Sequence, residues 1–257
     1  MKSFEGDFST LWTLNQRPPI QHLTWDWWWW LVMLDDDEHP KVGKQLMVLW
    51  STKENDVVHI NDVEWKPKGT PGFDDEGGIQ IDGMVCAWWF DGSVMHDEII
   101  AKVCDMIVLP SNHSSWPGKE GQGGGAVVPL LGNDCSMGMH SDRTKFWLNL
   151  DLNHEAVQSI RLEMTPWNPA MSTTREATAT YLGSLGYDIL RLHGTQVKGT
   201  IDGADVNGTA YFQKVCVQAP SVPWYWGVLH FSDGSYLDWF LPHVSTTILS
   251  RDPRAWK

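Results

Sequence analysis

The sequence predicts an all-β protein, either an antiparallel β-barrel or a two-sheet sandwich, with long loops and few short helices. Short apolar or alternating runs are separated by Gly, Asp, Asn and Pro, and long helical periodicity is scarce. Asp-Gly and Asn-Gly pairs, which favour tight turns, recur along the chain. The five pairs are Asp82-Gly83, Asp91-Gly92, Asp202-Gly203, Asn207-Gly208 and Asp233-Gly234.

The N-terminal residues 1–19 have no basic start followed by an apolar core, so we expect no signal peptide. No apolar run approaches the ~20 residues needed to span a bilayer, so we expect no stable membrane insertion. The cysteines are scattered without a C-x-x-C pair and indicate buried thiols of a reducing compartment. We therefore expect a cytoplasmic protein and leave peripheral membrane association open. The four cysteines are Cys86, Cys104, Cys135 and Cys216.

The first predicted strand is the stretch "TWDWWWWLVMLDDD", from Thr24 to Asp37. Because a strand turns successive side chains to opposite faces, Trp27 and Trp29 would point one way and Trp28 and Trp30 the other. We expect one of these pairs to line a cavity and the other to pack beneath an outer layer. The acidic residues 35–39 that follow indicate a solvated turn in preference to a cation site.

The middle of the chain is less regular. The run from His96 to Leu109 fits a short helix or a strand, and residues 174–186 could hold one or two helical turns. Residues 110–138 are Gly-rich and without period, which predicts a long loop. The glycines at 121–125 lack a preceding strand and a Lys-Ser/Thr ending, so they do not indicate a phosphate-binding loop.

The most informative stretch is "PWYWGVLHFSDGSYLDWFLPH", residues 223–243, which predicts a hairpin turning at Asp233-Gly234. As a strand, its first half puts Trp224, Trp226, Val228 and His230 on one face. If that face points into a barrel, it lines a pocket for an apolar molecule. The alternative is an ordinary aromatic core in which His230 is hydrogen-bonded to backbone. The segment 203–208 lacks the acids of a calcium loop and predicts a turn.

Composition excludes several classes of function. Acidic residues exceed basic ones by 32 to 19, and the net charge of -13 disfavours nucleic acid as a partner. The ten histidines show no zinc-type spacing, so we expect no metal. The sequence has no G-x-S-x-G motif, which disfavours a hydrolase with a serine nucleophile. Seventeen tryptophans against five tyrosines suit an aromatic core, a sugar platform or an apolar ligand pocket.

Two blocks of the chain resemble a known family. The stretch "DWWWW", Asp26 to Trp30, together with "NGTAYFQKVCVQAPSVPWYWGVLHFSDGSYLDWF", Asn207 to Phe240, is similar to the carotenoid 1,2-hydratase and AttH-type lipocalin-like family. Its relatives include fungal prenyl hydratases and Diels-Alderases. The family has an early D/E-W-W-Y-F-D strand, a later G-x-x-Y-H-D-x-N-W-G segment and then W-Y-W-G. The resemblance covers most of the chain loosely and these two blocks closely.

The chain departs from this pattern after Tyr211. Where the family has His-Asp-x-Asn-Trp, the chain has Phe212, Gln213, Lys214, Val215 and Cys216. The His and Asp that handle protons in the hydratases are therefore replaced. Relatives usually continue into a second lipocalin-like half, so we expect residues 1–257 to form a single lipocalin-like unit, either complete or the N-terminal part of a longer two-barrel protein.

The resemblance implies a calyx of antiparallel strands around an apolar cavity, an isoprenoid or polyketide-like ligand and no cofactor. Three functions stay open. The first is a cofactor-independent hydratase, cyclase or isomerase acting on an isoprenoid-like substrate, and the second is a non-catalytic binding protein for a hydrophobic small molecule. The third is a carbohydrate-binding or carbohydrate-cleaving sandwich. The oligomeric state is not predicted.

Candidate site residues follow from the two blocks and the acid–base chemistry that they offer. The predicted catalytic residues are Asp26, His140, His230 and Asp238. The predicted substrate-binding residues are Trp27, Trp29, Tyr211, Gln213, Trp224, Trp226 and Tyr236.

Overall fold

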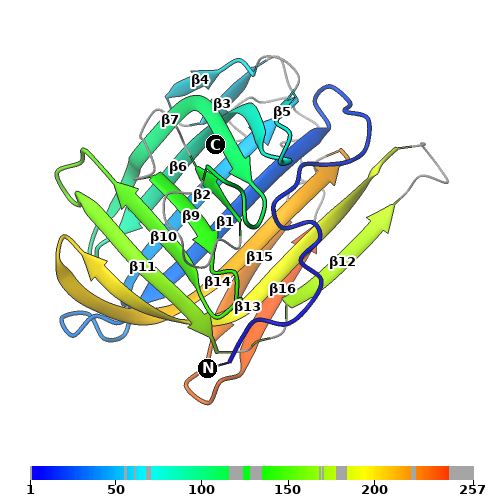
Figure 1. The fold of residues 1–257 in the computed structure, drawn as a ribbon. Coiled ribbons are helices and arrows are strands. Elements are labelled where there is room, and N and C mark those ends of the chain that lie inside the picture. Colours follow the sequence, from blue (N-terminus) through cyan, green and yellow to red (C-terminus); the bar gives the residue numbers. More distant parts are fainter. Residues whose placement is uncertain are drawn as a thin grey trace.

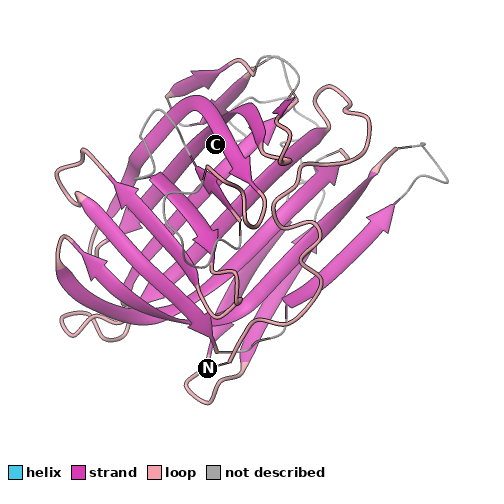
Figure 2. Ribbon diagram, viewed as in Figure 1, coloured by secondary structure: helices cyan, strands magenta, loops and turns pink. Residues whose placement is uncertain are grey.

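The computed structural model describes residues 2–54, 57–60, 62–67, 71–115, 124–127, 135–167, 169, 171–177, 184–220 and 224–242. These residues form sixteen strands and no helix (Figure 2). The all-β prediction is confirmed, whereas the few short helices are not found among these residues. The described chain accordingly has no helix with the length and hydropathy needed to cross a membrane.

Ten strands follow one another in a closed antiparallel circuit (Figure 1). The circuit closes because β11 pairs with β10 on one side and with β13 on the other. The architecture is therefore a barrel, and the sandwich alternative is wrong. In spatial order the strands are β11 (Ser159–Pro166), β10 (Phe146–Asp151), β9 (Cys135–Met139), β8 (Gly125–Val127), β7 (Met95–Leu109), β6 (Ile79–Phe90), β2 (Lys44–Lys53), β1 (Thr24–Leu34), β14 (Ala204–Gln218) and β13 (Gly186–Ile201).

Six further strands extend or flank the barrel. β12 (Met171–Ala177) pairs with the first half of β13, and β5 (Gly72–Phe73) pairs with β6. β3 (Val58–Ile60) and β4 (Val63–Trp65) form a small ribbon. β15 (Trp224–His230) and β16 (Tyr236–Pro242) form a separate two-stranded hairpin.

Three of the five predicted turns connect strands as expected. Asp91-Gly92 links β6 to β7, Asp202-Gly203 links β13 to β14, and Asp233-Gly234 closes the β15–β16 hairpin. Gly234 has a φ of 87°, a conformation that glycine adopts without steric cost. The C-terminal hairpin is thus confirmed.

The other two pairs are wrong as turns, because Asp82-Gly83 lies inside β6 and Asn207-Gly208 inside β14. Their glycines serve a close approach between strands. A side chain on Gly208 would collide with the carbonyl oxygen of Met33 on the neighbouring strand. Glycine inside a strand often marks such a contact. Of the turn predicted at residues 203–208, only Gly203 lies in a turn, and residues 204–208 belong to β14.

Two predictions for the middle of the chain are resolved. The ambiguous run 96–109 is a strand, since it lies within β7. The expected long loop at 110–138 contains β8 and most of β9, while its residues 116–123 and 128–134 lie outside the described chain. Of the expected helical turns at 174–186, residues 174–177 are strand and 178–183 lie outside the described residues.

The barrel interior is packed with large apolar side chains. Along β1 every second residue is buried, which places Trp28 and Trp30 inside and leaves the alternate residues partly exposed. Trp30 contacts Phe146 from β10 and Phe212 from β14, across the barrel and beside it. Burial of this aromatic surface is the main stabilising term of the fold.

The N-terminal segment, residues 4–19, crosses one end of the barrel, and we call it the strap (Figure 1). Its first part is fixed to the turn before β10, where the amide of Phe4 donates to the carbonyl of Arg143 at 2.7 Å. Further on, the carbonyl of Leu11 accepts from the indole of Trp28 at 2.6 Å. The strap adds Phe4, Leu11, Trp12 and Leu14 to the interior cluster.

Candidate functional site

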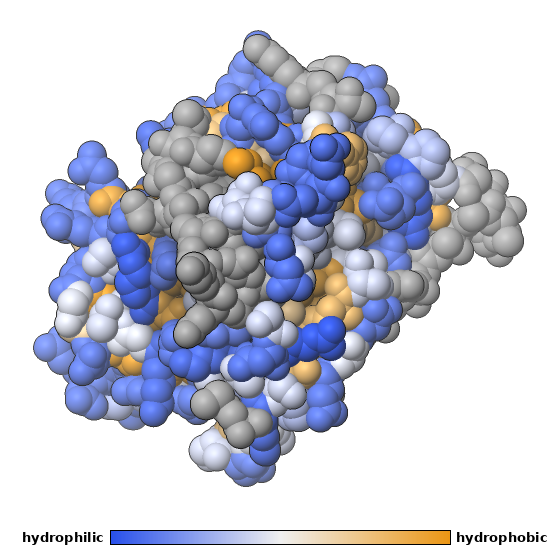
Figure 3. Space-filling model, in the orientation of Figure 1, coloured by the Kyte–Doolittle hydropathy of each residue, from blue (hydrophilic) through white to orange (hydrophobic). Residues whose placement is uncertain are grey.

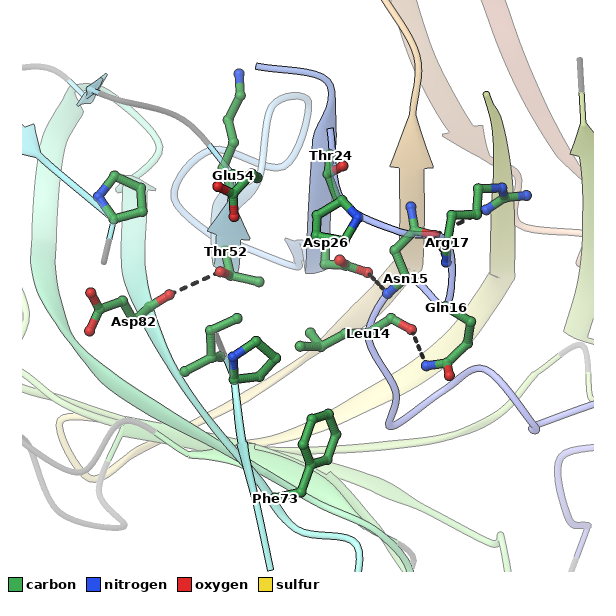
Figure 4. Close-up of a pocket in the computed structure, with 15 residues that line it drawn as sticks. Leu14, Asn15, Gln16, Arg17, Thr24, Asp26, Thr52, Glu54, Phe73 and Asp82 are labelled. Atoms are coloured by element: carbon green, nitrogen blue, oxygen red, sulfur yellow. Dashed lines mark hydrogen bonds between the residues drawn. The ribbon is translucent and has the colours of Figure 1, made fainter. Parts of the chain in front are cut away.

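A pocket of about 230 Å³ opens where the strap meets the end of the barrel (Figure 4). We call it the mouth pocket. One side is formed by the strap, and the others by the start of β1, the end of β2 and the start of β6. It is lined by Leu14, Asn15, Gln16, Arg17, Pro19, Thr24, Asp26, Thr52, Lys53, Glu54, Pro67, Pro71, Phe73, Ile81 and Asp82.

The buried end of the mouth pocket holds an ion pair. Asp26 is 3% exposed, and its Oδ1 lies 3.0 Å from Nζ of Lys214, which is 1% exposed. The same oxygen accepts from the backbone amide of Asn15 in the strap, also at 3.0 Å. Asp26 faces inward on β1 by the same alternation that buries Trp28. On the neighbouring strand β14, Lys214 pairs with Trp28, two residue pairs along from Asp26 and on the same face.

Lys214 stays charged in this environment. Burial is the largest single effect and lowers the pKa of Lys214, but the Asp26 carboxylate and Cys216 together outweigh it, so the pKa is raised. The ammonium also lies 3.9 Å from the centre of the Trp28 ring and donates to the carbonyl of Val215 at 3.2 Å. The cation therefore has a carboxylate, a carbonyl and an aromatic face as partners.

Cys216, the cross-strand neighbour of Asp26, is a thiol and no nucleophile here. Burial raises its pKa to about 12, a larger effect than the opposing charge of Lys214. The other three cysteines are also buried and free. A cysteine reacts as the thiolate, so these residues contribute packing and no covalent chemistry.

A second group of polar and aromatic residues lies on the outside of the barrel, under the β15–β16 hairpin. Trp226 of the hairpin contacts Trp29 of β1 and Tyr211 of β14, with ring centres 4.7 and 5.2 Å away. The Tyr211 hydroxyl accepts from the Gln213 side chain at 2.6 Å and donates to Asp238 at 3.3 Å. We call these residues, with the histidines described next, the hairpin cluster.

Asp238 is the charged centre of the hairpin cluster. Burial raises a carboxyl pKa, but a hydrogen bond from His193 and the nearby Arg191 charge outweigh it, so the pKa of Asp238 is lowered. Nδ1 of His193 lies 3.4 Å from the Asp238 carboxylate. The His193 ring stacks on Tyr236 at 4.6 Å between ring centres. Tyr211 in turn has a raised pKa, chiefly through burial, and remains a phenol.

His230 lies in the hairpin cluster but makes two hydrogen bonds that fix it. Nε2 donates to the carbonyl of His193 at 2.6 Å, and Nδ1 then accepts from the Thr209 hydroxyl at 2.8 Å. This is the arrangement of a core histidine bonded to backbone, the alternative considered from the sequence. Burial lowers its pKa, so the neutral ring is favoured.

The predicted site residues therefore fall in four places, the fourth being the position of Trp27 against Trp25 on the outer face of β1. Asp26 lines the mouth pocket, and His140 lies in the turn between β9 and β10. The hairpin cluster contains Trp29, Tyr211, Gln213, Trp226, His230, Tyr236 and Asp238. The side chain of Trp224 lies outside the described residues.

One expectation about these residues is corrected. Trp27, Trp29 and Trp226 do not line the inside of the barrel, because the buried face of β1 carries Trp28 and Trp30. Trp27 packs against Trp25 on the outer face, with ring centres 5.0 Å apart. The expected aromatic-lined hollow is occupied by the interior cluster. The physical reason is the alternation of the strand. Asp26 must face Lys214 inside the barrel, so Trp28 and Trp30, two and four residues later, also point inward, and Trp27 and Trp29 point outward.

Several residues at these sites were not predicted from the sequence, among them Asn15, Thr52, Lys214, Arg191 and His193. The signal for Lys214 was present, because a single positive residue in the apolar run "AYFQKVCV" matches the single negative residue before "WWWW". Isolated charges inside apolar strands are buried only when paired. Asn15 carries no such signal, since its position depends on where the strap crosses the barrel.

The acidic turn brings Asp36, Glu38 and His39 together, with their possible ligand atoms all within 4.8 Å of one another. Asp36 is already compensated, because His39 lies 2.9 Å and Lys44 3.5 Å from its carboxylate oxygens. A lysine ammonium beside the carboxylate disfavours a metal ion there. The turn therefore has the character of a charged, internally paired loop.

Comparison with known proteins gives one structural likeness. No family model matches the chain, and no curated protein matches it. A crystal structure of a candidate AttH from Nitrosomonas europaea superimposes with a TM-score of 0.50 at 14% identity. The match covers 87% of this chain and 62% of that one, so this chain spans less than two thirds of its length. At this identity the likeness establishes an AttH-like, lipocalin-like fold.

Proposed function

We propose that the protein binds a small, mostly apolar molecule in the mouth pocket, with the polar end of that molecule turned toward Asp26. The observation that carries the proposal is an ion-paired carboxylate, 3% exposed, in the lining of a pocket whose walls include Leu14, Phe73 and Ile81. Ligand sites of this kind combine apolar walls with a few fixed polar groups. Lipocalin-like barrels supply such pockets at their open ends.

The polar groups of the mouth pocket favour a hydroxyl group on the ligand. A carboxylate such as Asp26 only accepts hydrogen bonds, whereas the side-chain nitrogen of Asn15 is buried and has no partner within the described structure. A hydroxyl can donate to the first and accept from the second. Satisfying a buried donor removes a cost of about 1–3 kcal/mol, which makes Asn15 a source of affinity.

The volume limits the size of the ligand. Sites for drug-sized molecules measure about 300–1,000 Å³, and the mouth pocket has about 230 Å³. A ten-carbon isoprenoid alcohol is therefore a better candidate than a carotenoid. Longer chains would have to extend out of the pocket into solvent.

A second candidate function is a cofactor-independent isomerase or lyase acting on the same isoprenoid-like class. It is favoured by the ion pair of Asp26 with Lys214, 3.0 Å apart, which places a carboxylate able to accept a proton in the lining of the mouth pocket. Hydration of an alkene by direct protonation would need a protonated acid instead. The geometry thus supports base-catalysed proton transfer more than the addition or loss of water, because a leaving hydroxyl would also have to receive a proton.

Binding can be tested by titrating the purified protein with geraniol, and with myrcene as the matched hydrocarbon that lacks the hydroxyl. We expect geraniol to bind at least about tenfold more tightly, and the Asn15→Leu variant to lose that preference. Gln21→Leu, outside the mouth pocket, is the control. Equal binding of both compounds, or none, would contradict the proposal.

The same samples separate the two functions. After prolonged incubation, gas chromatography with mass spectrometry shows whether geraniol is recovered unchanged. Recovery of geraniol alone supports binding without chemistry. A double-bond isomer, or a hydrocarbon formed by loss of water, supports the isomerase or lyase.

The four buried free thiols are in keeping with our proposal of a reducing, cytoplasmic setting.

A further inference from the structure

The β15–β16 hairpin has a second face that points away from the barrel. The strand register pairs Tyr225 with Leu241 and Leu229 with Leu237, so these four side chains share one face. They are 66%, 57%, 47% and 50% exposed, in that order. Between the two pairs, the indole of Trp239 lies over Gly227. We call these six residues the hairpin outer face, and none of them carries a charge.

This face differs from the rest of the described surface. The large exposed hydrophobic residues elsewhere are Val42, Phe73, Val94 and Met95, while seven others belong to the hairpin or its turn. Single exposed apolar residues are normal, but a contiguous patch indicates an interaction site. Among the described strands, β15 and β16 form a two-stranded sheet of their own, separate from the barrel sheet.

We propose that the hairpin outer face binds the same face of a second copy of this chain, forming a weak symmetric dimer. Charge limits where two such copies can meet. Two copies that each carry a net charge of -13 repel one another, and an uncharged apolar face is where they can approach with the least repulsion. A two-fold axis through the hairpin places each apolar residue against the equivalent patch of the partner.

The area of the face is in keeping with a weak dimer. At about 200 Å² for a large side chain when fully exposed, the four paired residues with Phe231 at the turn present roughly 500 Å². Two copies would then bury roughly 1,000 Å², which lies in the range of weak, transient interfaces. A two-stranded hairpin is only marginally stable by itself, so this cover also stabilises it. The inference is independent of what the mouth pocket binds.

Sedimentation velocity tests the proposal, with the whole chain at about 1 to about 200 μM, since interfaces of this size give micromolar affinities. We expect the wild type to shift from monomer to dimer over this range. Higher salt should leave the dimer unchanged or strengthen it, because salt screens the repulsion between acidic copies. A wild type that is monomeric throughout would overturn the proposal.

The test variant is Tyr225→Lys with Leu237→Lys, which places like charges on the face without putting them opposite each other in the hairpin. Its control is Val42→Lys with Val94→Lys, which changes the net charge equally at residues of similar exposure. We expect the first variant to weaken the dimer at least about tenfold and the control to leave it unchanged. Circular dichroism and thermal melts verify that both fold.

Three outcomes overturn the dimer. One is a test variant that still dimerises like the wild type, and another is a control that weakens the dimer as much as the test variant. The third is a monomeric wild type that sediments with vesicles of neutral phosphatidylcholine, which would assign the face to a lipid surface.

Discussion

The two faces of β1 bury their side chains in different ways. On the inner face, Asp26, Trp28 and Trp30 are enclosed by the complete circuit of strands and by the strap. On the outer face, Trp27 is partly exposed, and Trp29 lies under the β15–β16 hairpin against Trp226. The comparison shows that tryptophan forms the enclosed core on the inner face and packs against the separate hairpin on the outer face. Four predictions sharpen it.

The largest effect is expected from breaking the inner ion pair. Asp26→Asn leaves the Lys214 ammonium buried beside a neutral amide, and breaking a buried pair in this way costs about 3–5 kcal/mol. Urea unfolding followed by tryptophan fluorescence measures the loss. Adding Lys214→Met to Asp26→Leu, which removes both charges, should recover most of it. A single variant within about 1 kcal/mol of the wild type would show that the pair is not buried.

The next effect compares two tryptophans of the same strand. Trp30→Ala leaves a cavity between Phe146 and Phe212 and should cost about 3–5 kcal/mol, whereas Trp27→Ala on the outer face should cost about 1 kcal/mol. The free energies of unfolding of the two variants, measured side by side, give the difference. Equal losses of unfolding free energy in the two variants would contradict the difference in burial between the two faces of β1.

A smaller and more local effect is expected in the hairpin cluster. Tyr211→Phe removes the hydroxyl that joins Gln213 to Asp238 and should cost about 1–2 kcal/mol. Amide hydrogen exchange should quicken in β15 and β16 more than in β2 and β6, because the hairpin opens without unfolding the barrel. Tyr225→Phe, with its hydroxyl on the exposed face, is the control. A uniform change across all strands would contradict this independence.

The smallest effect is a dependence on pH. Burial lowers the pKa of His230 from its ordinary 6.5, so the open or unfolded state takes up a proton at a higher pH than the closed hairpin. The stabilisation is therefore complete above 6.5 and is lost as pH falls through the folded pKa. Exchange in β15, corrected for the intrinsic rate, should be faster at pH 5.5 than at pH 7.5. His230→Asn should reduce this difference, and an unchanged difference would contradict the assignment.

Much of the fold could be predicted from the sequence. The strand at Thr24–Leu34, its alternation and the hairpin at Asp233-Gly234 all follow from local patterns, and the structure contains them. The sequence could not show which face of β1 is buried, because both faces carry indoles. The pair Asn207-Gly208 favours a turn locally, but it lies within a strand, where Gly208 allows β14 to pack closely on β1. Barrel closure depends on the pairing of β11 with β13, which no local pattern encodes.

The candidate site was less predictable than the fold. Asp26 could be singled out because it is a lone carboxylate in an apolar strand, and it does line the mouth pocket. Its partner Lys214 lies 188 residues away in sequence, so only the register of β1 with β14 reveals the pair. Tyr211 of β14 and Asp238 of the hairpin, both predicted as site residues, do meet, although on the outside of the barrel.

The ion pair has a consequence for how the chain finds its alignment during folding. If β1 slid by one residue, its inner face would carry Trp25, Trp27, Trp29, Leu31 and Met33, which is as apolar as the native set. Hydrophobicity alone therefore cannot distinguish the two alignments of this strand. Asp26 distinguishes them, because in the slipped alignment its carboxylate points away from Lys214. The lysine ammonium is then left buried without its ion-pair partner. One carboxylate thus settles a choice that four indoles leave undecided.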